Sequence, residues 1–216
     1  MSLKAALRTV PNVPATMDLA QANAAQAAAQ IAYFRAIPWC ASHLSQPNLV
    51  VDQSVARRLT TTQRDTLISR TLNTADAIPA YITFYQAPPP NAAKEGYLIK
   101  EVKSFVALGP MVNGWEGICH GGMVVTLLDE VMGQVFAANK VNGLLVNIPV
   151  MTGYLNTRFE RPVRTGTAEK PAVVLVSARM LRNEGRKYWL EAEITGEDGG
   201  VMARGEACFV MLKGKL

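Results

Sequence analysis

One segment of the sequence combines residue types that suit acyl-transfer chemistry. Two glycines, Gly121 and Gly122, follow His120 and open a stretch with helical periodicity. The first backbone N–H groups of a helix have no intrahelical acceptor, and the helix dipole adds partial positive charge there. Such a helix end can hold an oxyanion. From these residues alone, a tight loop-to-helix turn that only needs two glycines is an equally good interpretation.

The acid at position 129 favours the functional interpretation. On a helical wheel Asp129 lies at the edge of the apolar arc, beside Val125, Met132 and Phe136. A carboxylate at this edge is partly desolvated, and because an unpaired buried charge is costly, such an acid is more often functional or paired than incidental. Glu130 lies about 100° further round the helix, and we expect it to be a solvated or ion-paired acid.

The spacing of Gly121 and Asp129 has a geometric consequence. The two residues are eight positions apart on one helix, so about 12 Å separates them along its axis. They cannot both contact one carbonyl group. If both act on one substrate, Gly121 of one subunit must face Asp129 of another, which two antiparallel helices related by a twofold axis would achieve. We therefore expect composite sites at a dimer interface.

The element that must position these residues is a helix over residues 121–139. Its apolar residues recur at i, i+3, i+4, i+7 and i+11, which is the pattern of one buried helix face; they are Val124, Leu127, Leu128, Val131 and Val135. A helix this apolar must be wrapped by other structure. We expect it to be buried against strands that precede and follow it in the sequence.

Strand patterns flank this helix. One strand is predicted before it, over 97–108, and four after it, over 145–159, 172–181, 188–195 and 201–212. An antiparallel sheet curled around one central helix satisfies this order, because the helix buries its wide apolar arc against one face of the sheet. The predicted fold class is therefore α+β.

The first 90 residues have a different character. An Ala/Gln-rich helix is predicted from Asp18, as its cap, to Arg35, with little side-chain bulk to bury. Residues 37–90 are broken by prolines into short helices and loops, and the run Pro88–Pro90 marks a boundary. We expect residues 1–90 to form an extension that is largely helical and loop, and residues 91–216 to form the main domain.

Composition narrows the class of ligand. The chain has 216 residues, 49% of them hydrophobic and 18% charged, which suits one core with an appendage and leaves surface to bury in an oligomer. Lys and Arg exceed Asp and Glu by 22 to 17, which gives a net charge of +5. This balance suits an anionic ligand. Because the sequence has no Lys/Arg-rich run and no nucleic-acid motif, we favour a phosphate-bearing small molecule over nucleic acid.

The cysteines bear on chemistry and on compartment. Cys40, Cys119 and Cys208 are far apart and outside metal-ligand spacings, which favours a reducing compartment such as the cytoplasm. Cys119 adjoins His120, but adjacent residues of an extended chain point apart, so we expect Cys119 to be a small buried hydrophobe. The chain has only two histidines, too few for a His-rich metal site.

Two features of the sequence bear on where the protein is located. No run of 18 or more apolar residues predicts a membrane span. Residues 1–17 resemble a weak mitochondrial presequence, because they carry basic residues and no acid; a plain disordered tail is the favoured alternative.

Two blocks of the sequence stand in a characteristic order. The first is His120–Gly122 followed by Leu127–Glu130, and the second is Met151–Asn156 running into Arg161–Val163. Together they resemble the acyl-CoA thioesterases of the hotdog superfamily, and more narrowly the small-acyl and aryl-CoA branch with an HGG...D signature. The resemblance covers about residues 95–213. The segments Arg70–Thr74 and Phe84–Tyr85 are also similar to the leader of fungal members.

The resemblance implies catalytic roles. The residue matching Asp129 activates the hydrolytic water or attacks the thioester directly. The match to Gly121 supplies a backbone N–H to the thioester oxygen, and Thr152 helps to hold the water. A side-chain amide before the glycines assists in some members, and Asn113 is the nearest candidate. His120 would hydrogen-bond either to the thioester or to the backbone of its loop.

The resemblance also implies the ligand and the assembly. Gly122 at the helix start would help to bind the substrate, and Arg161 and Arg182 would meet the phosphates of coenzyme A; a solvated basic rim is the equal alternative for either arginine. No metal or bound cofactor is expected, since coenzyme A enters as part of the substrate. The expected assembly is a homodimer or a dimer of dimers.

Three functions follow from this resemblance. The first is hydrolysis of an acyl or aryl thioester of coenzyme A or of a carrier protein. The second is a non-hydrolytic hotdog protein that binds an acyl or polyketide chain and assists its release or cyclisation. The third is a dehydratase or hydratase, which usually pairs a carboxylate with a catalytic histidine, here His120. The acid at position 129 favours hydrolysis, because a protein that only binds has no need of it.

Overall fold

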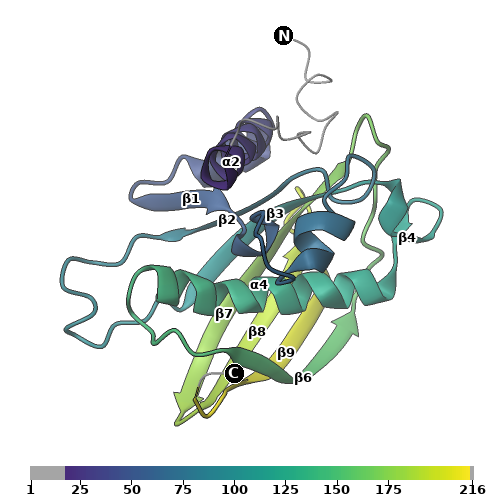
Figure 1. Ribbon diagram of the computed structural model, residues 1–216. Helices are drawn as coiled ribbons and strands as arrows, with labels where there is room; N and C mark the ends of the chain where they lie inside the picture. The colour runs from purple at the N-terminus through teal and green to yellow at the C-terminus, as the bar shows by residue number, and fades with distance from the viewer. Residues whose placement is uncertain (1–17, 215–216) are drawn as a thin grey trace.

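A seven-stranded antiparallel sheet with one long helix across it dominates the computed structural model, which describes residues 18–214 (Figure 1). The strand order is β1-β2-β3-β7-β8-β9-β6. The strands are β1 (Leu49–Gln53), β2 (Tyr81–Gln86), β3 (Glu101–Leu108), β6 (Val150–Phe159), β7 (Ala172–Glu184), β8 (Lys187–Thr195) and β9 (Val201–Met211). This arrangement confirms the predicted α+β hotdog fold. The presequence-like residues 1–17 lie outside the described residues.

The central helix is α4 (Gly121–Val141), as predicted. The five stripe residues are all buried; they are Val124, Leu127, Leu128, Val131 and Val135. Burying each such side chain contributes about 1.5–3 kcal/mol, so this face fixes how the helix lies on the sheet. Length and hydropathy alone would admit α4 as a membrane span, but half of the qualifying window is buried, as in a core helix.

The predicted strands all form, with shifted ends. β8 shows the expected alternation, since Tyr188, Leu190, Ala192 and Ile194 are all buried. A small second sheet, the hairpin of β4 (Asn113–Trp115) and β5 (Ile118–Cys119), leads into α4. Its turn contains Gly117 at φ +68°, a left-handed conformation that favours glycine. Before it lies the short 3-10 helix η3 (Pro110–Val112).

The helix predicted near the start of the described chain is α2 (Leu19–Arg35). Asp18 caps it as expected, accepting a hydrogen bond from the backbone N–H of Gln21 at 2.8 Å. The expectation that α2 buries little is wrong, because Phe34 is fully buried and stacks on Phe105 with ring centroids 5.6 Å apart. The two aromatic residues near the end of the helix, Tyr33 and Phe34, pack against the sheet. These side chains, and not the alanines, supply most of the buried apolar volume of α2.

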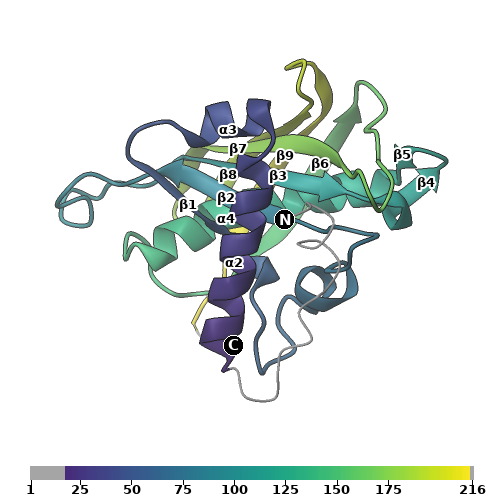
Figure 2. The ribbon, with the colours of Figure 1, turned by 90° about the horizontal axis from the view of Figure 1, so that it is seen from above.

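The helices α2 and α3 (Pro38–Leu44) lie over one end of the sheet (Figure 2). Side chains of β2 alternate between two cores: Tyr81 packs with α4, whereas Ile82 and Phe84 pack with α2 and α3. Since successive residues of a strand point to opposite faces, α4 and the α2–α3 pair cover opposite faces of the sheet.

Residues 37–90 differ from the prediction of short helices and loops. They include a 3-10 helix, η1 (Val55–Arg57), and a short π-helix, η2 (Leu67–Thr71), but also β1 and β2. β2 pairs directly with β3 across the predicted boundary. The runs LVVDQ and YITFYQ are rich in β-branched and aromatic residues, which is a strand signal; the surrounding prolines masked it. The division of the chain at residue 90 stays a prediction.

Candidate active site

Asp129 and Thr152 lie side by side, as the sequence predicted for two members of one site. The Thr152 hydroxyl donates a hydrogen bond of 2.7 Å to Oδ1 of Asp129. Asp129 is half-buried on α4, and Thr152 is exposed on the edge strand β6. Because the hydroxyl proton points at the carboxylate, the lone pairs of the Thr152 oxygen are free to accept from a water molecule.

A β-bulge sets the direction of the Thr152 side chain. The register between β6 and β9 shifts between Thr152 and Tyr154, so Gly153 is the extra residue. A Cβ at Gly153 would lie 3.0 Å from the Cys208 carbonyl oxygen, which explains why glycine occupies the bulge. Bulges often re-aim a side chain beside an active site; here the bulge lets Thr152 face α4 at the edge of the sheet.

The start of α4 presents a free donor. Gly121 is the first residue of the helix and is exposed, and its backbone N–H has no hydrogen-bond acceptor among residues 18–214. His120 is the N-cap, since its Nδ1 accepts a hydrogen bond of 2.9 Å from the Gly122 N–H. Of the two interpretations of His120, the structure therefore shows the contact with the loop backbone. The same contact occupies the Gly122 donor, leaving Gly121 as the available one.

The β4–β5 hairpin before α4 contains Asn113 and Cys119, for which the sequence analysis also made predictions. Asn113 is exposed, and its Oδ1 accepts a hydrogen bond of 2.5 Å from the Thr165 hydroxyl. Asn113 pairs with Cys119 in the β4–β5 hairpin, and Cys119 is two residues before Gly121. Cys119 is buried, which raises the pKa of its thiol to about 12. It is the small buried hydrophobe that the sequence predicted.

The structure does not bring Arg161 and Arg182 together within one chain. Arg161 binds the Asp198 carboxylate at 3.1 Å and the Val201 carbonyl at 3.0 Å, near the start of β9. Arg182 pairs with Glu184 and lies 3.7 Å over the Trp189 ring, and Trp189 pairs with Cys208 near the end of β9. The two arginines therefore lie toward opposite ends of the sheet.

A cleft of about 440 Å³ extends from Asp129 along α4. Its lining combines charged side chains of α4 and of residues 64–65 with apolar side chains of α4, β6 and β9, among them Phe136, Val141, Val150 and Phe209. Ligand pockets typically measure about 300–1,000 Å³ and include a few polar groups that orient the ligand. The cleft therefore has the size of a ligand pocket, and it brings Asp129 and apolar side chains into one space.

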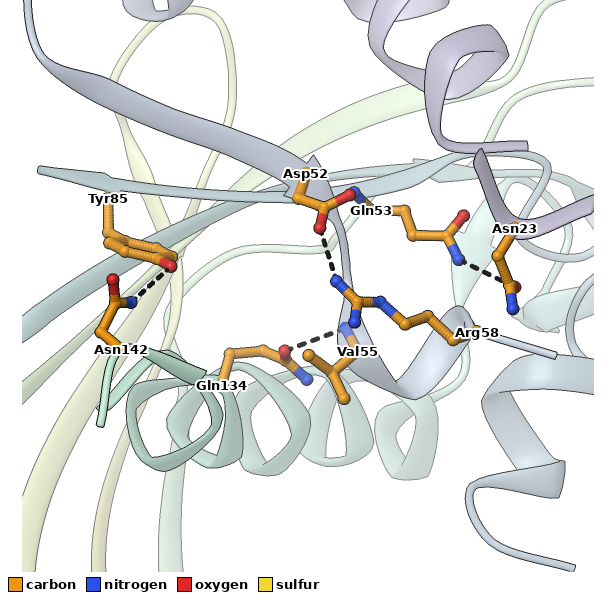
Figure 3. Close-up of polar contacts among 8 residues, drawn as sticks. All are labelled: Asn23, Asp52, Gln53, Val55, Arg58, Tyr85, Gln134 and Asn142. Atoms are coloured by element: carbon orange, nitrogen blue, oxygen red, sulfur yellow. Dashed lines mark hydrogen bonds and ion pairs between the residues drawn. The ribbon is translucent and has the colours of Figure 1, made fainter. Parts of the chain in front are cut away.

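The N-terminal segment forms one wall of this cleft. Val55 and Ala56 of η1 line it, together with Arg64 and Asp65. The wall is attached to α4 by a hydrogen bond of 3.3 Å from the Val55 N–H to the Gln134 side chain (Figure 3). The sequence reasoning missed these residues, because nothing in the local pattern of residues 54–65 says that they fold back onto α4.

Two further polar contacts brace the wall. Asp52 and Arg58 form an ion pair at 2.5 Å, and the Asn142 amide donates to the Tyr85 hydroxyl at 3.0 Å (Figure 3). The first contact closes the turn that contains η1, and the second connects the end of α4 to β2. The cleft wall is thus tied to β1, and the C-terminal end of α4 to β2.

The expectation for Glu130 was wrong. Its carboxyl group is half-buried in the cleft and has neither an ion-pair partner nor a side-chain hydrogen bond among residues 18–214. Burial raises the pKa of Glu130 to about 7, and the negative charges of Asp65 and Asp129 contribute in the same direction. The helical wheel placed Glu130 outside the main core, but it did not show that another segment covers that side.

No cluster of three or more His, Cys, Asp and Glu side chains that could hold a metal ion occurs among the described residues.

Comparison with known proteins finds one family match and several relatives. Residues 116–203 match the thioesterase superfamily. This range includes α4 and most of the sheet that follows it in the sequence. Verlamelin biosynthesis protein B of a Lecanicillium species is 35% identical over 138 residues, which cover 53% of this chain and 58% of the relative. Acyl-coenzyme A thioesterase THEM4 of Bos taurus is 30% identical over 90 residues, covering 42% of this chain and 32% of the relative.

Solved structures include similar chains. A Bacillus halodurans protein crystallised with CoA has a TM-score of 0.42 and 27% identity, covering 51% of this chain and 66% of that one. The matches thus span less than two thirds of each of these three relatives.

The capping contact predicts the effect of replacing His120. A His120→Ala variant should lose about 1 kcal/mol of unfolding free energy, because the Gly122 N–H loses its acceptor. His120→Asn should retain the wild-type value, since asparagine is a favoured N-cap. Urea denaturation with linear extrapolation measures both. An alanine variant as stable as wild type would show that the contact does not stabilise α4.

Proposed function

We propose that this protein, whose residues 116–203 belong to the thioesterase superfamily, hydrolyses an acyl or aryl thioester of coenzyme A or of a carrier protein, with Asp129 as the catalytic carboxylate. The observation that carries the proposal is the Asp129–Thr152 hydrogen bond in the lining of a cleft that also presents apolar side chains. The relative named as an acyl-coenzyme A thioesterase supports the same class of substrate.

The proposed mechanism uses groups that the fold already holds in place. Asp129 takes a proton from a water molecule that Thr152 orients, and the water oxygen attacks the thioester carbonyl carbon. In the alternative, the Asp129 carboxylate attacks the carbonyl carbon itself, and water then hydrolyses the resulting anhydride. In both, the carbonyl oxygen becomes an oxyanion, the carbon–sulfur bond breaks, and the thiolate leaves and is protonated. A single well-aimed donor to such an oxyanion contributes about 3–4 kcal/mol.

The oxyanion donor must come from a second copy of the chain. Gly121 offers a free backbone N–H, but about 12 Å of rigid helix separates it from Asp129. The free edge of the sheet supports a dimer, because β9 is the one strand that pairs with β6 in the described part of the chain. Exposed apolar side chains lie along this edge, among them Met151, Tyr154 and Phe159. A long apolar edge strand left unpaired is prone to association.

The two ends of β6 define a register for this dimer. Thr152 near its start contacts Asp129, whereas a Cβ at Gly121 would lie 3.6 Å from the ring of Phe159 at its end. When identical strands pair antiparallel about a twofold axis perpendicular to the sheet, one residue pairs with its own copy. With that residue at Asn156, Gly153 lies opposite Phe159 of the partner subunit. Asp129 then approaches Gly121 of the partner subunit.

A second candidate is a protein that binds an acyl chain and assists its release or cyclisation without hydrolysis. One relative is named for verlamelin biosynthesis, which is a biosynthetic role and not a hydrolytic one. Hydrolysis is favoured, because binding alone would not require a half-buried carboxylate hydrogen-bonded to a hydroxyl group. Binding of acyl-CoA without thiol release would reverse this preference.

Replacing Asp129 tests the proposed chemistry. Asp129→Asn should lower kcat by roughly 10²- to 10⁴-fold, because the amide is a poor base and a poor nucleophile. Thr152→Val, which removes only the hydroxyl, should cost roughly 10- to 100-fold. Thiol release from a panel of acyl- and aryl-CoA substrates measures both variants, with size-exclusion chromatography as the control for assembly. Unchanged turnover in Asp129→Asn would remove this carboxylate from the mechanism.

Cysteine cross-linking tests the proposed register. In Asn156→Cys the two new thiols would lie across the twofold axis, where antiparallel Cα atoms are about 4.5–5.5 Å apart, within disulfide reach. The native cysteines are buried and should stay reduced under mild oxidation.

The matched controls are Arg158→Cys and the double variant Tyr154→Cys/Arg158→Cys. The single variant should stay monomeric on non-reducing gels, because residue 158 would face residue 154 of the partner subunit, and the double variant should cross-link. Preferential cross-linking through Arg158→Cys alone would refute the register.

A further inference from the structure

The cleft contains a second carboxyl group that the proposed mechanism does not use. Glu130 follows Asp129 on α4, and both line the cleft. An isolated half-buried carboxylate without a hydrogen-bond or ion-pair partner is costly. A neutral carboxylic acid avoids that cost, because it needs no counter-charge.

The groups around Glu130 come from three elements. On α4 they are Asp129 and Lys140, and on the N-terminal segment they are Arg64 and Asp65. Burial lowers the pKa of Lys140, and its ammonium group donates a hydrogen bond of 2.7 Å to the Ile148 carbonyl, so it is engaged away from Glu130.

The third element is β2. Its Tyr81 is fully buried, and the charge of Glu130 contributes, after burial, to raising the pKa of the Tyr81 phenol. Arg57 of η1 acts on the same phenol in the opposite direction. Asp65 and Asp129 are the carboxylates that act on Glu130 within residues 18–214, and both disfavour its ionisation.

We propose that Glu130 is a positioning residue that keeps its proton in the working enzyme, so that Asp129 is the one anion that α4 presents to the thioester within its described residues, Gly121–Val141. The inference rests on the thioesterase function proposed above. The transition state of thioester hydrolysis is anionic at the carbonyl oxygen. Ionisation of Glu130 would place a second negative charge beside Asp129, which disfavours that transition state and raises the pKa of the catalytic carboxylate.

The ionisation of Glu130 sets the direction in which turnover changes with pH. Burial and the two neighbouring acids raise the pKa of Glu130 to about 7, so the group is neutral below pH 7 and becomes charged above it. Turnover should therefore decline as the pH rises through about 7. Because solvent and salt partly screen the charge of this half-buried group, the expected decline is roughly tenfold.

Variants of two residues test the inference in opposite directions. In Glu130→Gln the amide cannot ionise, so the ratio of kcat/KM at pH 8.5 to that at pH 6 should rise roughly tenfold over wild type. In Asp65→Asn one neighbouring charge is removed, which lowers the pKa of Glu130, so the decline should move to lower pH. The same profiles with an acyl-pantetheine, which lacks the nucleotide phosphates, control for titration of the substrate.

A direct titration separates this inference from the proposed function. ¹³C NMR of the full-length wild type, with the Glu130 carboxyl signal assigned by its loss in Glu130→Gln, should show a midpoint near pH 7 whether or not the protein turns over thioesters. A midpoint near 4.5 would overturn the inference, as would a decline above pH 7 that persists in Glu130→Gln. Absence of turnover in wild type would overturn the proposed function, and the titration would still decide the state of Glu130.

Discussion

The rigidity of α4 is the constraint on which the proposed active site depends. Burial of its apolar face fixes the helix on the sheet, and the helix in turn fixes Asp129 and the Gly121 N–H about 12 Å apart. Neither group can move to the other without unfolding a core helix. A reaction that uses both must therefore be assembled from two chains, and the free edge of strand β6, beside both groups, is the natural place for that contact.

The sequence predicted the parts of the molecule that local patterns control. The helical stripe around Leu127 and Leu128 predicted α4, and the alternation from Tyr188 to Ile194 predicted β8. The position of Asp129 at the edge of the apolar arc predicted its half-burial. Each of these follows from one element facing one core, which is information that spacing along the chain contains.

Tertiary contacts determined the rest. The bulge at Gly153 that turns Thr152 toward Asp129 depends on the approach of the Cys208 carbonyl, and no local pattern encodes it. The state of Glu130 depends on burial and on Asp65, which is 65 positions away in the sequence and follows η1, the segment attached to α4 through Gln134. The N-terminal segment is thus both part of the sheet, through β1 and β2, and a wall of the cleft.

Subunit mixing tests the composite site most directly. Gly121→Pro removes the proposed oxyanion donor at the first helical position, where proline is favoured, and the extended backbone of His120 suits a following proline. Co-expressed with Asp129→Asn under separate tags, it should form mixed dimers in which one site has both groups intact. In a random mixture half of the dimers are mixed and each has one intact site of two, so a composite site predicts about one quarter of wild-type turnover. Mixed dimers that stay inactive would contradict the composite site.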